Sequence, residues 1–238
     1  YDTYHIGGVF GQGSVEHADV TISGTITGNG NGSFSASGVT NQGSVRNCAV
    51  IFTGEASEIS ATSSETGSVY AAILGAYIAG GDVSLSDVKI CNSTSSPIVV
   101  KAVGKGENTG WAGGLFGNVT SATATSDTWL RLDGTVTVEG DFTVTGGAHA
   151  GGICGAISNE YSVSVDSYIN TMEVSSENGR VGGLFGSIAP GNGEKQVVLH
   201  NCLNAGAVSG KNKGGLIGYW NNSGTLALSG CAYLETDG

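Results

Sequence analysis

The sequence predicts an all-β fold, a right-handed parallel β-helix (β-solenoid) of about seven coils with 30–42 residues each. Three observations lead to this prediction. A glycine-rich box recurs along the chain, and the 42 glycines are accompanied by only 2 prolines. Short Val- and Ile-rich runs are separated by Gly, Asn and Ser, and no stretch of ten residues has convincing helical periodicity. Repetition with variable spacing is typical of a stacked array rather than of one globular core.

The box has the pattern Gly-Gly-Leu-Phe-Gly. Five copies are clear, Gly7–Gly11, Gly113–Gly117, Gly151–Gly155, Gly182–Gly186 and Gly214–Gly218. Two degenerate copies fill the gap between the first two, one that starts at residue 37 and one, Ala71-Ala72-Ile73-Leu74-Gly75, that starts at residue 71. The steps between successive copies are then 30, 34, 42, 38, 31 and 32 residues. A constant box with varying steps indicates fixed strands joined by loops of different length.

Each box is followed by further strand-like segments. The second segment of the unit carries a cysteine in four copies, Val45–Cys48, Val88–Cys91, Leu199–Cys202 and Leu226–Cys231. A third, alternating segment follows in several units, as in Thr25–Thr27, Val136–Val138, Phe142–Val144 and Ala207–Ser209. One unit is therefore expected to hold about three short strands.

We expect the glycine pair to turn a corner at the same place in every coil, because glycine adopts positive φ at little steric cost. The third and fourth box positions raise a question, because both are apolar although adjacent strand residues face opposite sides. Either other protein covers the outer residue of each pair, or a bulge turns both side chains inward. The first alternative is slightly favoured, and it predicts a packed layer over the row of Phe10, Phe116 and Phe185.

Composition limits the partners of the chain. Nine Lys and Arg against 20 Asp and Glu give a net charge of −11, which argues against nucleic acid and against anionic membrane surfaces. The chain contains no run of eighteen apolar residues, so no membrane-inserted helix is predicted. Cofactors are not expected, although acidic loops are compatible with calcium. We expect residues 1–238 to form a single solenoid domain, a fragment of a longer surface protein, because neither end carries a distinct cap.

Five cysteines form an odd set without any Cys-x-x-Cys pair: Cys48, Cys91, Cys154, Cys202 and Cys231. The favoured interpretation is that they are buried, small apolar side chains. In a secreted chain, disulfides between neighbouring coils are the alternative, with Cys202 and Cys231 as the best-placed pair.

Near the C-terminus the unit is most complete. Asn201–Cys202, a Gly turn, Ala207–Ser209, a second Gly turn and Gly214–Gly218 together resemble the GLUG repeat, strongly over residues 190–238 and loosely elsewhere. The resemblance implies a β-helix in a large secreted or cell-wall protein, such as an adhesin-like bacterial protein. Repeats of this family also occur beside the catalytic domain of IgA-cleaving zinc metallopeptidases. The resemblance carries no catalytic residue over to this chain.

Enzymatic chemistry has little support in the residues. A glycosidase needs two carboxylates at one sugar bond, and the nearest groupings are Asp82 with Asp87, and Asp127 with Asp133, Glu139 and Asp141. The four histidines, His5, His17, His149 and His200, have no metal-ligand spacing, and His5 and His149 are expected in turns before a box. No catalytic residue, cofactor site or metal site is therefore predicted.

Aromatic side chains are the candidates for contact with a glycan or a protein partner: Trp111, Trp129, Tyr219 and Trp220. The predicted function is a non-catalytic extracellular module at the cell surface, a stalk or an adhesin that contacts a host or neighbouring-cell protein or glycan. Self-assembly into a filament is the first alternative, and a polysaccharide-processing β-helix enzyme is the second. An exposed aromatic groove would favour the adhesin, apolar end coils the filament, and paired carboxylates in a cleft the enzyme.

Overall fold

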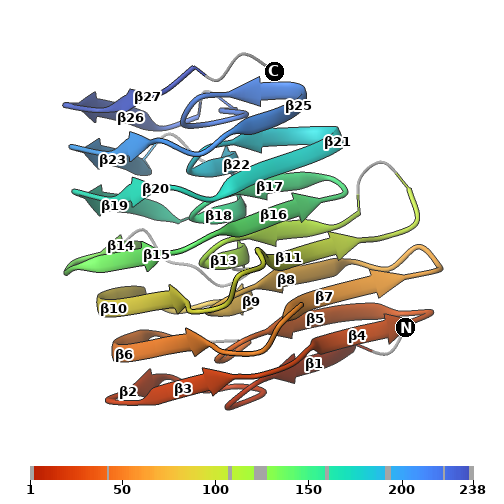
Figure 1. The fold of residues 1–238 in the computed structure, drawn as a ribbon. Coiled ribbons are helices and arrows are strands. Elements are labelled where there is room, and N and C mark those ends of the chain that lie inside the picture. Colours follow the sequence, from red (N-terminus) through yellow and green to blue (C-terminus); the bar gives the residue numbers. More distant parts are fainter. Residues whose placement is uncertain are drawn as a thin grey trace.

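The computed structural model describes residues 3–41, 43–106, 109–120, 128–158, 161–190, 194–221 and 223–235. Within these ranges the chain is all β, and every strand pairing is parallel (Figure 1). The chain winds into stacked coils, each bonded to the coils above and below. The predicted parallel β-solenoid is therefore confirmed.

Two large sheets run the length of the stack. Sheet A has 11 strands: β1 (Thr3–Gly7), β4 (Ile26–Gly30), β5 (Ser33–Ser37), β7 (Glu58–Ser63), β8 (Val69–Ala72), β11 (Ile98–Val103), β12 (Trp111–Gly113), β16 (Phe142–Gly146), β17 (His149–Gly151), β21 (Glu173–Gly182) and β25 (Val208–Gly214). Sheet C has 9 strands: β2 (Val15–Glu16), β3 (Asp19–Ile22), β6 (Val45–Phe52), β10 (Val83–Asn92), β14 (Trp129–Leu132), β15 (Val136–Glu139), β19 (Ser162–Asp166), β23 (Gln196–His200) and β26 (Thr225–Ser229).

Two smaller sheets complete the coils. Sheet B follows the box and contains β9 (Gly75–Ala79), β13 (Phe116–Thr120), β18 (Cys154–Ser158) and β22 (Phe185–Ala189). Sheet D contains β20 (Ile169–Asn170), β24 (Leu203–Asn204) and β27 (Ala232–Tyr233). The stretch from β14 to β18 holds five strands, so the expectation of about three strands per unit was too low. Short bends divide segments that the hydrophobic pattern alone shows as continuous.

Equivalent residues stack in register from coil to coil. Val20, Val50, Ile90 and Val138 occupy one column of sheet C, and Val50 and Ile90 are fully buried. Burial of such columns supplies the main stabilising term, about 25 cal/mol for each Å² of apolar surface. One hydrophobic cluster extends from Val15 to Cys202, so the described coils share a continuous core.

A corner in sheet C is built from left-handed residues that stack on one another. Backbone φ is positive at this position in six coils: His17, Asn47, Asp87, Ser167, Asn201 and Gly230. Asn, Asp and Gly tolerate this conformation better than other residues. The corner therefore has a local sequence cause, unlike the corner at the box.

The box glycines serve close backbone approach rather than positive φ. None of them has a positive φ, so the predicted reason for the glycine pair was wrong. A Cβ on the first glycine would overlap the carbonyl oxygen three residues later, as at Gly182 and Phe185. A Cβ on the second glycine would overlap an atom of a neighbouring segment. At Gly183, that atom belongs to the side chain of Asn204. Asn204 is itself buried and accepts a 2.8 Å hydrogen bond from the Asn170 amide in the coil below.

Both apolar box residues point into the core because the chain bulges at the box. The amides of Leu115 and Phe116 donate to the same carbonyl oxygen, that of Ile153, at 3.2 and 2.7 Å. Two donors on one acceptor are the mark of a β-bulge, which breaks the alternation of side chains. Leu115 and Phe116 are fully buried by the chain itself. The favoured expectation of a covering layer was therefore wrong, and the bulge alternative is confirmed.

From Gly75 to Phe185, the fourth box position alternates small and large residues from coil to coil. Phe116 pairs with Gly75 below and Cys154 above, and Cys154 pairs with Phe185. A Cβ at Gly75 would lie 3.1 Å from the Phe116 ring, which fills the space that Gly75 leaves. This register also shifts the degenerate box by one residue, because Ala72 pairs with Gly113. The box starts at Ala72 rather than at Ala71.

All five cysteines are free thiols. Cys48, Cys154 and Cys202 are buried, as predicted for small apolar side chains, whereas Cys91 and Cys231 are partly exposed. Cys202 and Cys231 do occupy equivalent positions in adjacent coils, since the next residues along pair as Leu203 with Ala232. The disulfide expected as an alternative for this pair is absent from the structure.

Candidate ligand-binding notch

A row of side chains, all large except Ser35, runs along sheet A on the side that faces away from the core. In register from coil to coil it consists of His5, Ser35, Tyr70, Trp111, His149 and Arg180. The next residue along each strand is fully buried, as for Ala71, Ala112 and Ala150. Alternation along a strand therefore turns the row outward. Each member from Tyr70 onward lies two residues before the first position of a box.

A second row comes from sheet B and its continuation, directly after the box. It contains Tyr77, Asn118, Ala156, Ser187 and Tyr219, of which the last follows from the bridges of Phe185 with Ile217 and Ile188 with Trp220. The residue after each of them faces the core: Ile78, Val119, Ile157 and Ile188 are buried, and Trp220 packs against the core.

The two rows meet across the box. The rings of Tyr70 and Tyr77 lie 4.7 Å apart between centroids, and the Arg180 guanidinium lies 3.5 Å above the Tyr219 ring. Arg180 Nη1 donates to Ser187 Oγ at 3.5 Å. Outward side chains of consecutive strands can meet only if the chain folds back on its outer side. The box is thus the inward tip of a notch, which we define by Tyr70, Trp111, His149 and Arg180 on one wall and Tyr77, Asn118, Ser187 and Tyr219 on the other.

Aromatic contacts line the notch along the solenoid. Tyr70 stacks on Trp111 with centroids 5.1 Å apart, and Trp111 lies 6.1 Å from the His149 ring. These contacts stabilise adjacent coils, at about 0.5–1.5 kcal/mol for each aromatic pair beyond the burial of area. Because the rings stack on one another, they present mainly their edges to a ligand.

Some buried polar atoms of the notch walls have no hydrogen-bond partner. Among the described residues there are five such side-chain atoms, and two belong to the notch walls, Asn118 Oδ1 and His149 Nδ1. Two more belong to Asn41, which is fully buried and takes the place of the last box residue in its coil. Buried polar groups are nearly always bonded in native proteins, so these atoms are exceptions, but neighbouring atoms cover them and they are not exposed to a ligand.

Electrostatics keep the notch histidine neutral. Burial, and after it the positive charge of Arg180, lowers the pKa of His149 to about 4. Burial also raises the pKa of Tyr70, while side-chain hydrogen bonds to Ser68 and Asn118 oppose that rise. At neutral pH the charge of the notch walls therefore comes from Arg180.

Acid is expected to destabilise the fold through His149. Its pKa is about 6.5 in the unfolded chain and about 4 in the fold, so the unfolded state takes up the proton first. The stability from neutral His149 is fully present above pH 6.5 and is lost as the pH falls toward 4, by up to about 3 kcal/mol. Urea unfolding of the wild type and of His149→Gln at several pH values measures this. The stability gap should shrink between pH 6.5 and 4 in favour of the variant. A gap that does not change with pH would contradict the prediction.

The structure brings together two of the four predicted contact residues. Trp111 and Tyr219 line the notch, at opposite ends of the series that runs through His149 and Arg180. Trp129 lies on sheet C under the Arg131 guanidinium, 4.4 Å from the ring centroid, and Trp220 turns toward the core.

Sequence reasoning missed Tyr70, Tyr77, Asn118, Arg180 and Ser187. These residues lie at a fixed number of positions before or after each box. That spacing is visible in the sequence, but it predicts no common surface unless one knows that the chain folds back at the box. His5 and His149 were expected in turns and instead lie in strands β1 and β17. The turn expectation for these two histidines was wrong.

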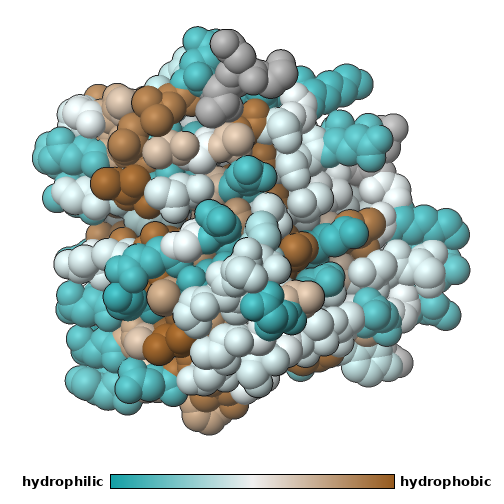
Figure 2. All heavy atoms as spheres, viewed as in Figure 1, coloured by the Kyte–Doolittle hydropathy of each residue, from teal (hydrophilic) through white to brown (hydrophobic). Residues whose placement is uncertain are grey.

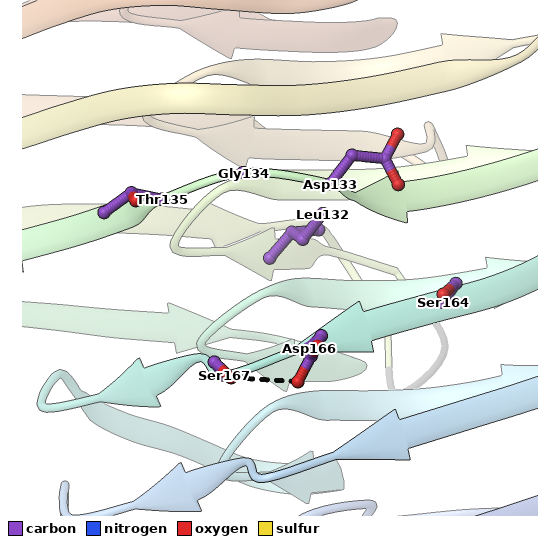
Figure 3. A pocket seen from close by; sticks show the side chains of 7 residues that line it. All are labelled: Leu132, Asp133, Gly134, Thr135, Ser164, Asp166 and Ser167. Atoms are coloured by element: carbon purple, nitrogen blue, oxygen red, sulfur yellow. Dashed lines mark hydrogen bonds between the residues drawn. The ribbon is translucent and has the colours of Figure 1, made fainter.

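A separate depression of about 420 Å³ lies on sheet C, beside the left-handed corner (Figure 3). It is lined by Leu132, Asp133, Gly134, Thr135, Ser164, Asp166 and Ser167. The carboxylate of Asp166 accepts hydrogen bonds from the Ser167 hydroxyl and pairs with His200 Nδ1, both at 2.9 Å. These bonds, that of His200 first, lower the pKa of Asp166. A glycosidase acid needs a raised pKa, so this side chain does not suit that role.

The other acidic side chains that the sequence grouped are occupied differently. Asp82 accepts a 2.8 Å hydrogen bond from the Trp129 amide, and Glu139 pairs with Lys89 at 2.9 Å. Asp127 lies outside the described residues. In the described part of the chain, no three His, Cys, Asp or Glu side chains are placed to hold a metal ion. No helix among the described residues is long and apolar enough to cross a membrane.

Comparison of the chain with known protein families, curated proteins and solved structures found no match. The structure defines the class of the protein, a parallel β-solenoid with a row of aromatic side chains on one lateral face.

Proposed function

We propose that this chain is a non-catalytic extracellular adhesion module, a β-solenoid at the cell surface that presents the notch to a glycan or protein partner. The observation that carries the proposal is the notch itself. It combines partly exposed ring side chains and an arginine on one lateral strip. An acidic, lysine-poor composition is consistent with an extracellular environment. This role needs no reactive side chains, because binding rests on contacts alone.

The test is binding of the purified chain to an array of glycans and extracellular proteins. The notch variant Trp111→Ala with Tyr77→Ala should lose the signals that the wild type gives. Trp129→Ala is the matched control, because it removes a partly exposed tryptophan from sheet C, and it should bind as the wild type does. Circular dichroism verifies that both variants fold. No binding by the wild type, or equal loss in the control, would refute the proposal.

Self-association is a second candidate, favoured by the end coils. Large apolar side chains are exposed at Tyr4, Val9 and Phe10 in the first coil and at Leu228, Tyr233 and Leu234 in the last. Figure 2 shows apolar side chains gathered at the end that carries β26 and β27. Unpaired strand edges with apolar side chains favour pairing with another chain. Light scattering after size-exclusion chromatography tests this candidate. A concentration-dependent oligomer that Leu228→Lys abolishes would support it, and a monomer at all concentrations would exclude it.

A further inference from the structure

We propose that Cys202 and Cys231 form an oxidation site, at which a disulfide donor joins the two thiols and fastens the last described coil to the coil below it. Both cysteines are thiols in the structure. The inference goes beyond the adhesion function and does not depend on it, since the two residues lie just before sheet D and not in the notch. It follows from the register of the two coils, the direction of the side chains and their different exposure.

The register places the two cysteines directly beside one another. Two residues before them, His200 pairs with Ser229. One residue after them, Leu203 pairs with Ala232. Neighbouring strands in register lie about 4.8 Å apart, and a disulfide spans Cα atoms that are about 4.4–6.8 Å apart. The two backbones are therefore already at bonding distance without a shift of register.

The two side chains also point in the same direction. Cys202 Sγ lies 3.3 Å from the His200 carbonyl oxygen, and Cys231 Sγ lies 3.4 Å from that of Ser229, the equivalent residue one coil further. The two thiols share a hydrogen bond. Side chains that point apart cannot be bridged, but these two are in contact. Because β27 is the last strand of sheet D, the segment at Cys231 can move toward Cys202 without displacing a further strand of that sheet.

No other two of the five cysteines, all of which the structure describes, are placed in this way. Cys91 pairs with Ile51 on one side and with Glu139 on the other. The register partners of Cys48 and Cys154 are valine and phenylalanine residues. Cys91 is partly exposed, as Cys231 is, but it has no cysteine beside it. The chain thus contains one pair that can close a bond and one exposed thiol that serves as its control.

The exposure of the two thiols sets the order of the chemical steps. Cys231 is partly exposed, so its thiolate attacks a disulfide donor such as oxidised glutathione, forms a mixed disulfide and releases one glutathione thiolate. The Cys202 thiolate then attacks Cys231 Sγ and releases the second. The two cysteines lose two protons and two electrons, which the donor takes up to become two molecules of reduced glutathione. Burial raises the pKa of Cys202 to about 11, so its thiolate is scarce and the second step is the slower one.

The bond would hold the coil of the described solenoid that is covered from one side only. In this coil Leu228 is 49% exposed and Tyr233 54% exposed, and Lys211 and Lys213 of β25 are exposed as well. A coil with one neighbour opens more easily than a coil between two neighbours. A disulfide reduces the entropy of the opened segment and so disfavours opening. We therefore expect oxidation to slow the opening of this coil.

The experiment treats the reduced chain with oxidised glutathione. Two of its five thiols should disappear without a matching gain of glutathione in the intact mass. Trypsin cleaves after Lys195, Lys211 and Lys213, so complete digestion without reductant should yield residues 196–211 joined to residues 214–238. Limited digestion of the folded chain at Lys211 and Lys213 should be at least about tenfold slower after oxidation.

Three variants identify the residues. Cys231→Ser should form no linked peptides, and its rate of trypsin cleavage should not respond to oxidation. Cys202→Ser should keep a glutathione on Cys231, because no second thiol resolves the mixed disulfide. Cys91→Ser is the matched control, and it should form the linked peptides as the wild type does. Circular dichroism verifies that each variant folds.

Four results would overturn the inference. A glutathione that persists on Cys231 in the wild type would show that Cys202 does not reach it. A disulfide between two chains, or one that includes Cys91, would show a different pairing. If no thiol is lost, the pair is not an oxidation site. Linked peptides with an unchanged rate of trypsin cleavage would show that the bond does not fasten the last described coil.

Discussion

Gly182→Ala is expected to destabilise the solenoid by about 3 kcal/mol or more. A Cβ at Gly182 would overlap the Phe185 carbonyl oxygen and would lie 2.6 Å from the Gly218 amide nitrogen and 2.7 Å from the Leu216 carbonyl oxygen. These atoms belong to the backbone of two coils, so no side-chain rotation relieves the overlap. Urea unfolding followed by circular dichroism measures the loss.

Gly24→Ala is the matched control, because a Cβ there meets no heavy atom within 4 Å. We expect it to leave stability unchanged or to raise it by up to about 1 kcal/mol, through the lower entropy of the unfolded chain. The chain itself carries Ala72 in the column of Gly182, in a coil where Gly75 replaces the box phenylalanine. Wild-type stability in Gly182→Ala would mean that the other coils can adopt that relaxed turn, and would contradict our account of the box.

Phe116→Ala should cost about 3–5 kcal/mol, the range for a fully buried aromatic side chain. The ring fills the space above Gly75, and Cys154 on the other side is too small to replace it. Phe10→Ala removes the same side chain from the same box position, but Phe10 is 50% exposed in the first coil. This control should cost less than about 1 kcal/mol.

Thermal and urea unfolding of the two phenylalanine variants distinguish burial from box position. An equal loss of stability in both variants would mean that the position in the box, and not the burial of the ring, determines the cost of the substitution. A loss for Phe116→Ala below that for Phe10→Ala would show that the inward bulge at Leu115 and Phe116 does not hold in solution.

Much of the architecture could be predicted from residues alone. The period of the box gave the number of coils, and the alternation in segments such as Val136–Glu139 gave strands, because both patterns are local and repeat in register. Local chemistry also explains the left-handed corner at Asn47 and Asn201. The prediction was wrong where geometry between coils decides: the reason for the glycine pair, the start of the box at Ala72, and the direction of Phe116.

The candidate site was predictable only in part. Trp111 and Tyr219 were chosen as contact residues, and they line the notch, but Trp129 and Trp220 were chosen for the same reason and do not. Aromatic character alone cannot separate these cases. The place of Arg180 beside Tyr219 could not be predicted, because a lone arginine in a sequence gives no sign of which face it occupies or which side chain it contacts.

The sequence by itself determined that this chain is a stack of parallel β coils, because a repeated box with strand-like segments can bury its apolar residues only against copies of itself. The tertiary structure decided that the box folds inward, since the bulge and the close backbone contacts of its glycines exist only between adjacent coils. That inward fold sends Leu115 and Phe116 into the core and brings Arg180 and Tyr219 together outside it. The same five residues that mark the period in the sequence thus form the floor of the notch.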